Sequence, residues 1–281
     1  MKRHLVDNLI KGLCFSILIA ASSCAEKVEG CLDPYSTNFD LDADLPCEDC
    51  CEYPGLSVSV GHYWDLDNTF RYSDPVFENL DSLDTIRINQ FGFYLSGMKL
   101  HTSTDSFGVT DRFNISNTLG TELTLETSYS WYNQSSSQSS YQGQFPNAGQ
   151  RIEAVSMWIG YDPSLGVLDP IGQGSTSPVA INSDSLNWSA SAGLLTSYLN
   201  FSRQGLLAED SISIDFTNSH YIYSLLDEAV NIDLGQDVSL QLRLYYQNLL
   251  QSCDVKNADF NQIKDCVYGN LPNSIEVHRL D

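Results

Sequence analysis

The chain has 281 residues, with 36 acidic and 14 basic side chains and a formal net charge of −22 at pH 7. A surface of this sign repels phosphates, which excludes nucleic acid as a partner. The length suffices for one good hydrophobic core or two small ones.

Residues 1–23 have the organisation of a lipoprotein signal peptide. Lys2 and Arg3 precede an apolar stretch, residues 13–21, which is too short to span a bilayer as a helix of about 20 residues. Small residues then lead to Cys24, and this arrangement resembles a lipobox, in which the cysteine becomes the acylated N-terminus. The pattern predicts an outer-membrane lipoprotein that is attached to the membrane through its lipid anchor and faces either the periplasm or the cell surface. Ordinary cleavage beside an incidental cysteine is the alternative.

The cysteines beyond Cys24 are even in number, which in an oxidising compartment predicts disulfides. They are Cys31, Cys47, Cys50, Cys51, Cys253 and Cys266. Because the first four lie close together in sequence, we expect two bridges among them and a third between Cys253 and Cys266. Cys50 and Cys51 are adjacent, and a bridge between them would be strained. A four-cysteine zinc site is the alternative for the first four.

Residues 24–54 form a Cys/Asp-rich module and linker. From Gly30 onward the segment resembles short modules of exported bacterial proteins and, distantly, thrombospondin type-3 calcium repeats. Asp40, Asp42 and Asp44 alternate, so a coiled loop would present their carboxylates to one calcium ion. The spacing does not match an EF-hand loop. The alternative is a solvated spacer held by disulfides.

Residues 55–281 show the period-two pattern of β-strands. Apolar and polar residues alternate over 56–60, 86–88, 212–216 and 238–244, and Gly, Asn, Asp, Ser and Pro clusters separate these runs. The pattern predicts an all-β fold, a β-sandwich of the Greek-key type. The Ser- and Gln-rich residues 135–150 are expected to form a loop. A short helix or a disulfide-tied excursion is expected over 248–265, before a final strand at 274–278.

Catalytic motifs are missing from the sequence. It contains no Gly-x-Ser-x-Gly, no His-Glu-x-x-His and no free cysteine that could act as a nucleophile. Acidic residues are abundant, but spacing does not distinguish a catalytic carboxylate pair from surface charge. We therefore expect a protein without enzyme activity.

Soft-metal ligands are few. The mature chain has four histidines, His62, His101, His220 and His278, and two methionines, which rules out a Met-rich copper site. His62 and Trp64 are two residues apart and would share one face of a strand. The affinity of an imidazole for a metal there should weaken below about pH 6.5, where an unperturbed histidine becomes protonated. Packing inside the sheet is the alternative role for both side chains.

The large domain carries an ordered set of landmarks: the stretches Val58 to His62, Ile86 to Leu100, Ala148 to Asp162 and Leu168 to Pro170, followed by Trp188 and Gly193. In their order and spacing they resemble the MbnP-like copper-binding domain family. The resemblance runs from about residue 56 to the C-terminus. It implies a sandwich fold, copper as cofactor, and a partner of the di-haem peroxidase type that modifies a tryptophan.

The sequence departs from this family at two positions. Ala190 stands where the family has the second tryptophan of a W-x-W phrase, the one we associate with oxidation to kynurenine. The family's late histidine falls near residues 216–218, where none occurs, and His220 is close but not aligned. The candidate copper residues are therefore His62, His220, Trp64 and Trp188.

These observations lead to two alternative functions, one of metal binding and one of binding a macromolecule. In the first, the chain is an envelope lipoprotein that captures copper. In the second, it is a non-enzymatic interaction module that binds a protein or glycan and has lost the metal site of its family. The 15 tyrosines and 4 tryptophans would supply half-polar anchors for such contacts.

Overall fold

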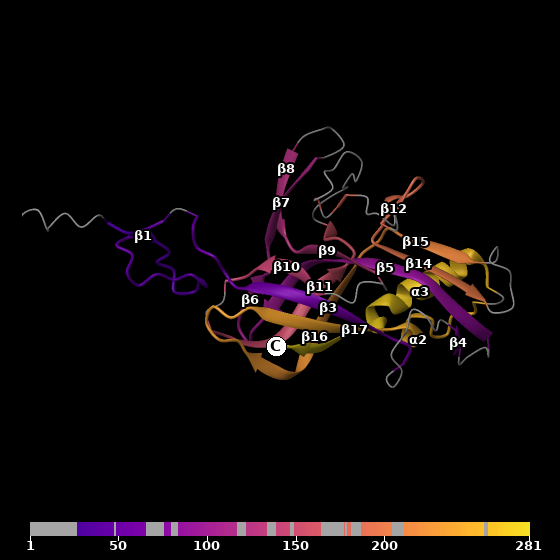
Figure 1. The fold of residues 1–281 in the computed structure, drawn as a ribbon. Coiled ribbons are helices and arrows are strands. Elements are labelled where there is room, and N and C mark those ends of the chain that lie inside the picture. Colours follow the sequence, from indigo (N-terminus) through magenta and orange to yellow (C-terminus); the bar gives the residue numbers. More distant parts are fainter. Residues whose placement is uncertain are drawn as a thin grey trace, which may run out of the picture. The chain divides into compact units, whose positions relative to one another are not determined.

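The chain forms two compact units, Met1–Glu52 and Tyr53–Asp281 (Figure 1). The computed structural model describes residues 27–47, 49–65, 76–79, 84–116, 122–133, 139–146, 149–163, 177, 179–180, 187–203, 211–255 and 258–281. The predicted signal peptide and Cys24 lie outside these residues. Within them, no helix is both long enough and apolar enough to pass through a bilayer.

Two disulfides hold the N-terminal unit together. The short strands β1 (Glu29–Gly30) and β2 (Leu45–Pro46) pair in parallel. One bridge joins Cys31 to Cys51 and the other joins Cys47 to Cys50. The four cysteines thus pair among themselves, and the adjacent Cys50 and Cys51 have different partners, as predicted.

One layer of the large unit is a four-stranded sheet. Its strands are β3 (Gly55–Tyr63), β10 (Ser140–Gln144), β17 (Val238–Tyr245) and β18 (Ile275–Leu280), in the order β10-β3-β17-β18. The first strand of the domain, β3, runs parallel to β17, and the other pairs are antiparallel. Residues from the two ends of the domain therefore lie side by side in this layer.

The larger sheet is built around the 18-residue strand β5. Its strands are β4 (Val76–Asn79), β5 (Asp84–His101), β6 (Ser106–Gly108), β9 (Tyr129–Asn133), β11 (Arg151–Ile159), β14 (Ser197–Arg203), β15 (Ile212–Phe216) and β16 (His220–Asn231). Their order is β15-β14-β5-β11-β16, and β4, β6 and β9 also pair with β5. This sheet with the four-stranded one confirms the prediction of an all-β sandwich with a disulfide-rich module.

The main core is shared by both sheets, and a smaller cluster lies elsewhere. Leu56, Val58 and Val60 from β3 pack in the main core with Phe91 and Phe93 from β5. The neighbouring Tyr94 belongs instead to the smaller cluster, with Ile115, Tyr129, Val179 and Leu194. Since successive strand residues point to opposite faces, this smaller cluster covers the outer face of the larger sheet.

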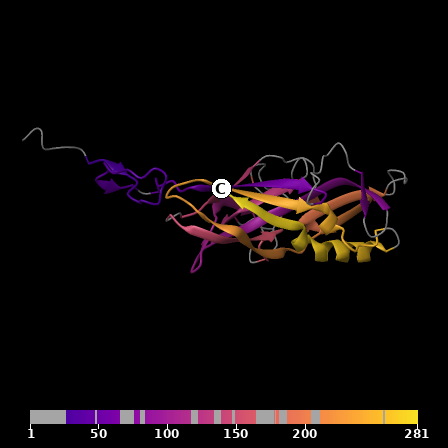
Figure 2. The ribbon, with the colours of Figure 1, turned by 90° about the horizontal axis from the view of Figure 1, so that it is seen from below.

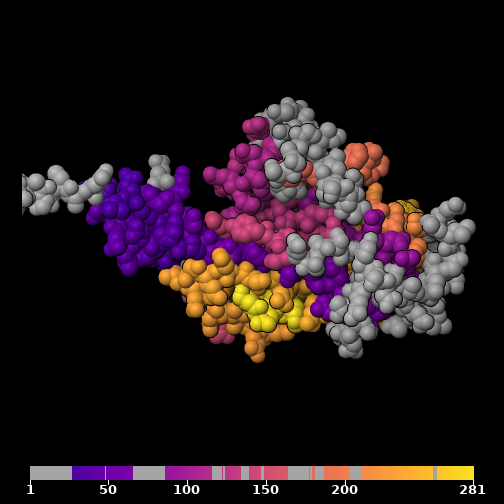
Figure 3. Space-filling view, in the orientation of Figure 1, coloured from indigo at the N-terminus to yellow at the C-terminus, as the bar shows by residue number. Residues whose placement is uncertain are grey.

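Two helices connect β17 to β18. They are α2 (Tyr246–Leu249) and α3 (Phe260–Ser274), and α3 lies along one side of the strands (Figure 2). Cys253 and Cys266 form the predicted bridge, which ties the connecting loop to α3. The predicted short helix is thus present but extends nine residues beyond position 265. In the space-filling view, orange and yellow residues lie next to one another in the lower part of the face shown (Figure 3).

The loop predicted over 135–150 is wrong at its centre, because Ser140–Gln144 forms the edge strand β10. The backbone of this Ser- and Gln-rich segment pairs with β3. Gln142 is buried, and its Nε2 donates a hydrogen bond to the Tyr132 hydroxyl at 2.6 Å. A tertiary partner for the polar side chain therefore outweighs the loop-like composition.

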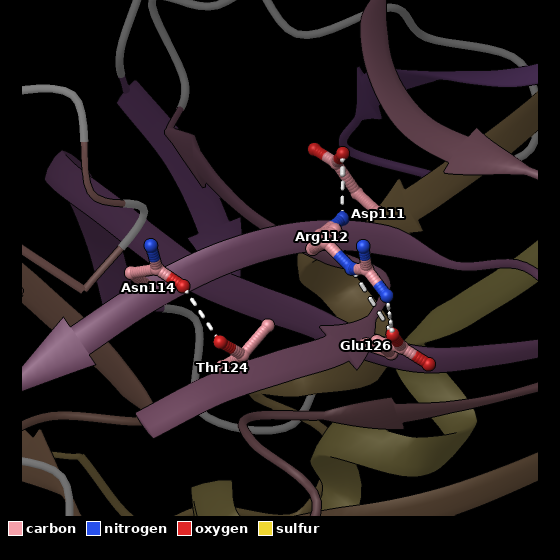
Figure 4. Close-up of polar contacts among 5 residues, drawn as sticks. All are labelled: Asp111, Arg112, Asn114, Thr124 and Glu126. Carbon is pink, nitrogen blue, oxygen red and sulfur yellow. Dashed lines mark hydrogen bonds and ion pairs between the residues drawn. The ribbon is translucent and has the colours of Figure 1, made fainter. Parts of the chain in front are cut away.

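The hairpin of β7 (Asp111–Ser116) and β8 (Glu122–Thr127) carries polar cross-strand contacts (Figure 4). Arg112 Nη2 lies 2.6 Å from Glu126 Oε1, and Thr124 Oγ1 donates to Asn114 Oδ1 at 2.8 Å. The ion pair is exposed, so we expect it to contribute less than about 1 kcal/mol to stability. Glu126 also lines the smaller of the two cavities described below.

Candidate functional site

Strand β3 directs His62 into the main core. Its residues alternate between half-buried and buried positions from Gly55 to Tyr63, and His62 is in the buried set. Trp64, two residues further on, is also buried. Both side chains are buried, but Trp64 lies just beyond the end of β3, so a shared strand face for the two stays a prediction.

The His62 imidazole has one nitrogen engaged and one without a partner. Nδ1 lies 3.0 Å from the Tyr246 hydroxyl oxygen, and the two rings stack with centroids 6.0 Å apart. Nε2 is buried and has no hydrogen-bond partner within the described part of the chain. Burial lowers the pKa of His62 from 6.5 to about 4, and the backbone of Asn133 opposes that shift. The ring is neutral near pH 7, as a metal ligand must be.

His220 has a similar free nitrogen in the opposite layer. It begins the edge strand β16, pairs with Ile159, and packs its ring on Tyr268 of α3 with centroids 3.9 Å apart. Its Nε2 is buried and has no hydrogen-bond partner among the residues described. Burial lowers the pKa of His220, while the Tyr268 backbone raises it. Ile222 and Leu226 follow at alternate positions and pack on the main core, so His220 points toward the space between the sheets.

The other two histidines use Nε2 for hydrogen bonds. His101 Nε2 lies 2.7 Å from the Ser156 hydroxyl. His278 Nε2 lies 2.7 Å from Arg243 Nη2, and it accepts this bond because a guanidinium group only donates. Of the four histidines, His62 and His220 are therefore the two with an unengaged, buried Nε2.

Trp188 lies in a different part of the domain from His62. It belongs to the hairpin of β12 (Trp188–Ser189) and β13 (Gly193–Leu194), where it pairs with Leu194. Leu194 packs in the smaller cluster with Tyr94 on the outer face of the larger sheet. His62 instead contacts Tyr246 of the main core, to which Trp64 also belongs, so the structure separates Trp188 from His62.

The acidic residues of the N-terminal unit bind their own backbone. Asp40 Oδ1 accepts a hydrogen bond from the Asp42 amide at 2.9 Å, and Asp44 Oδ2 accepts one from the Val28 amide at 3.3 Å. Across the described ranges, Cys47, Cys50 and Cys51 are the one group of three or more potential ligands that lie together. The structure therefore does not gather the three carboxylates as calcium requires.

The disulfide bonds argue against a zinc site at the four cysteines of the N-terminal unit. All four cysteines of the N-terminal unit are in disulfides. A zinc site needs thiolate ligands, which a disulfide cannot supply. The structure therefore supports the disulfide interpretation of this module.

Sequence reasoning missed the tyrosines around both imidazoles and an aromatic surface on β16. Tyr246 and Tyr268 come from α2 and α3, far from His62 and His220 in sequence, and no local pattern marks them. Tyr221 and Tyr223 are 49% and 54% exposed. The sequence does offer one signal for this surface, because Tyr221 and Tyr223 are two residues apart and so lie on the same face of a strand.

Comparison with known proteins gives one structural match. No family model and no curated protein matches the chain. Among solved structures, MbnP from Methylosinus trichosporium is similar with a TM-score of 0.45 and 9% sequence identity, over 71% of this chain and 78% of that one. An identity this low transfers no ligand and no residue role to the present chain.

Proposed function

We propose that this protein is a non-enzymatic, lipid-anchored envelope protein that captures copper(I) through His62, with His220 as the second imidazole. The observation behind this proposal is that each of these histidines has a buried Nε2 that makes no hydrogen bond of normal geometry among the residues described, although a backbone group lies near each ring, that of Asn133 at His62 and that of Tyr268 at His220. Leaving a buried polar nitrogen unpaired costs about 1–3 kcal/mol, so such positions call for an explanation. Imidazole nitrogen is a suitable ligand for copper.

The surroundings of His62 suit a ligand role. A metal-binding Nε2 needs its proton on Nδ1, and Nδ1–H then donates to the Tyr246 hydroxyl. Burial raises the pKa of Tyr246, so its hydroxyl stays protonated and remains available as the acceptor. Such a partner fixes the tautomer and the orientation of a ligating imidazole.

Copper(I) competition tests the proposal. Purified mature protein is titrated with copper(I) against a coloured chelator, and we expect one ion per chain. Affinity should fall at least about tenfold in His62→Ala and in His220→Ala, because each removes one ligand. His101→Ala is the matched control, since its Nε2 already bonds Ser156. A wild type that fails to compete, or equal affinity in all variants, would refute copper capture.

A tryptophan-modifying partner is a further part of this proposal. The sequence resemblance implies a di-haem peroxidase-type protein, and Ala190 occupies the position of the usual target. Trp64 is then the candidate indole, because it is buried and lies two residues from His62 in the sequence. Peptide mass mapping of protein from its native envelope would detect an oxidised Trp64.

A second candidate function is the interaction module. It is favoured by the half-exposed Tyr221 and Tyr223 on the edge strand β16, which offer aromatic surface to solvent. Exposed tyrosines of this kind are common anchors in recognition surfaces.

A further inference from the structure

A cavity of about 900 Å³ opens where the edges of the two sheets meet. Tyr221 and Tyr223 come from β16, Tyr245 from the end of β17, and Glu276 from β18. The strands β16 and β18, which contact each other, are end strands of their sheets. The volume is in the range of small-molecule binding sites.

The aromatic side chains of this cavity are held by neighbours. Tyr221 packs on Trp158 with ring centroids 5.2 Å apart and an angle of 58°. Tyr223 packs on His101 with centroids 5.0 Å apart and an angle of 65°. Both tyrosines remain about half exposed. Two aromatic side chains at alternate positions of one strand thus present fixed surface, and binding to them costs little side-chain entropy.

The polar side chains of the cavity suit hydroxyl groups. Gln247, Asn248 and Asn273 bring amides, and Asp65 and Glu276 bring carboxylates. Amides donate and accept, and carboxylates accept, so together they match a ligand with many hydroxyls.

The charge of the lining disfavours anions. No lysine or arginine is among the described residues that line this cavity. Arg243 stands opposite the lining residue Glu276 in the register of β17 and β18 but does not line the cavity itself. With a net charge of −22 for the whole chain, phosphate, sulfate and acidic sugars are disfavoured.

A second cavity adjoins Tyr221, since this residue lines both cavities. It has a volume of about 680 Å³. Trp158, Asp162 and Glu126 line it, with Lys99 as its cation. Gly97 has a φ of +58°, and a Cβ there would lie 3.0 Å from the Trp158 ring. Two neighbouring cavities that share one aromatic residue suit an elongated ligand.

We propose that the surface lined by these two cavities, called the groove below, binds a neutral oligosaccharide chain, with Tyr221 and Tyr223 stacking on its sugar rings. The proposal rests on the interaction-module candidate and does not require copper at His62. Sugar rings have apolar faces that stack on aromatic rings and hydroxyl edges that bond to amides and carboxylates. The groove combines both features.

Affinity electrophoresis of the full mature chain tests this directly. Native gels contain, one at a time, neutral β-glucan, xylan and mannan, and polygalacturonate serves as an anionic comparison. We expect at least one neutral polysaccharide to retard the wild type. Tyr221→Ala and Tyr223→Ala should each weaken binding about tenfold, because each removes a stacking ring. Tyr221→Phe should stay close to wild type, since the ring is kept.

The control is Tyr141→Ala, which removes a 51% exposed tyrosine from β10 in the other sheet. It should bind like the wild type, with matched thermal unfolding for all variants. His62→Ala should also retain binding, so a failed copper assay and a failed glycan assay are separable. No retardation by any neutral polysaccharide, retardation by polygalacturonate alone, or equal binding by the Tyr221, Tyr223 and Tyr141 variants would overturn the proposal.

Discussion

Burial keeps His62 neutral over the pH range in which an exposed imidazole titrates. Its pKa in the folded protein is about 4, against 6.5 for the unperturbed group. The sequence by itself predicts that metal affinity weakens below about pH 6.5. With the lowered pKa, protons compete with a metal at His62 only at more acidic pH, so binding should persist to about pH 5.

The same pKa shift predicts how stability depends on pH. Between pH 6.5 and about 4 the unfolded state binds the His62 proton more readily than the folded state, so acidification favours unfolding. Wild type should lose roughly 1 kcal/mol more per pH unit in this window than His62→Gln. Urea unfolding at pH 7.5, 6 and 5 measures both slopes. Equal slopes would mean that His62 titrates alike in the two states.

At the scale of elements, helix α3 is specified by residues within it and is attached to the domain by a disulfide to a residue outside it. Asp259 and Gln262 form a capping box at its start, and Ile263, Val267 and Leu271 line its buried face. Its attachment depends on the bridge from Cys266 to Cys253, which is 2% exposed. Asn270 Nδ2 also donates to the Gln251 carbonyl at 2.7 Å.

Removing this bridge should destabilise the large unit. The bonded cysteines are 13 residues apart, and a loop of about that length is expected to contribute about 3 kcal/mol. Chemical unfolding, followed by tryptophan fluorescence, compares the wild type with the double variant Cys253→Ser, Cys266→Ser. The matched control is Cys31→Ser with Cys51→Ser, whose bridge lies in the other compact unit. Equal loss in both double variants would contradict a local role for the bridge.

At the scale of the whole molecule, we propose that a lipid on Cys24 anchors the protein to the outer membrane. The proposal rests on the short apolar run and the small residues before that cysteine. Expression in a bacterial host with labelled fatty acid should label the wild type and place it in the membrane fraction. Cys24→Ala should lose the label and appear in the soluble fraction, and a label that persists would disprove the anchor.

Local patterns in the sequence determined the fold class and the disulfide partition. Alternation over 56–60 identified β3 and its inward face, because period two along a strand is a property of the chain alone. The clustering of Cys31, Cys47, Cys50 and Cys51 likewise separated their bridges from the one joining Cys253 and Cys266.

Only the tertiary structure decided which side chains meet. Tyr246 reaches His62 across 184 positions of sequence, and the separation of Trp188 from His62 follows from packing on opposite faces of a sheet. Ser140–Gln144 became a strand because β3 offers it a partner. Contacts of this kind depend on strand order and register, which alternation within a single segment cannot specify.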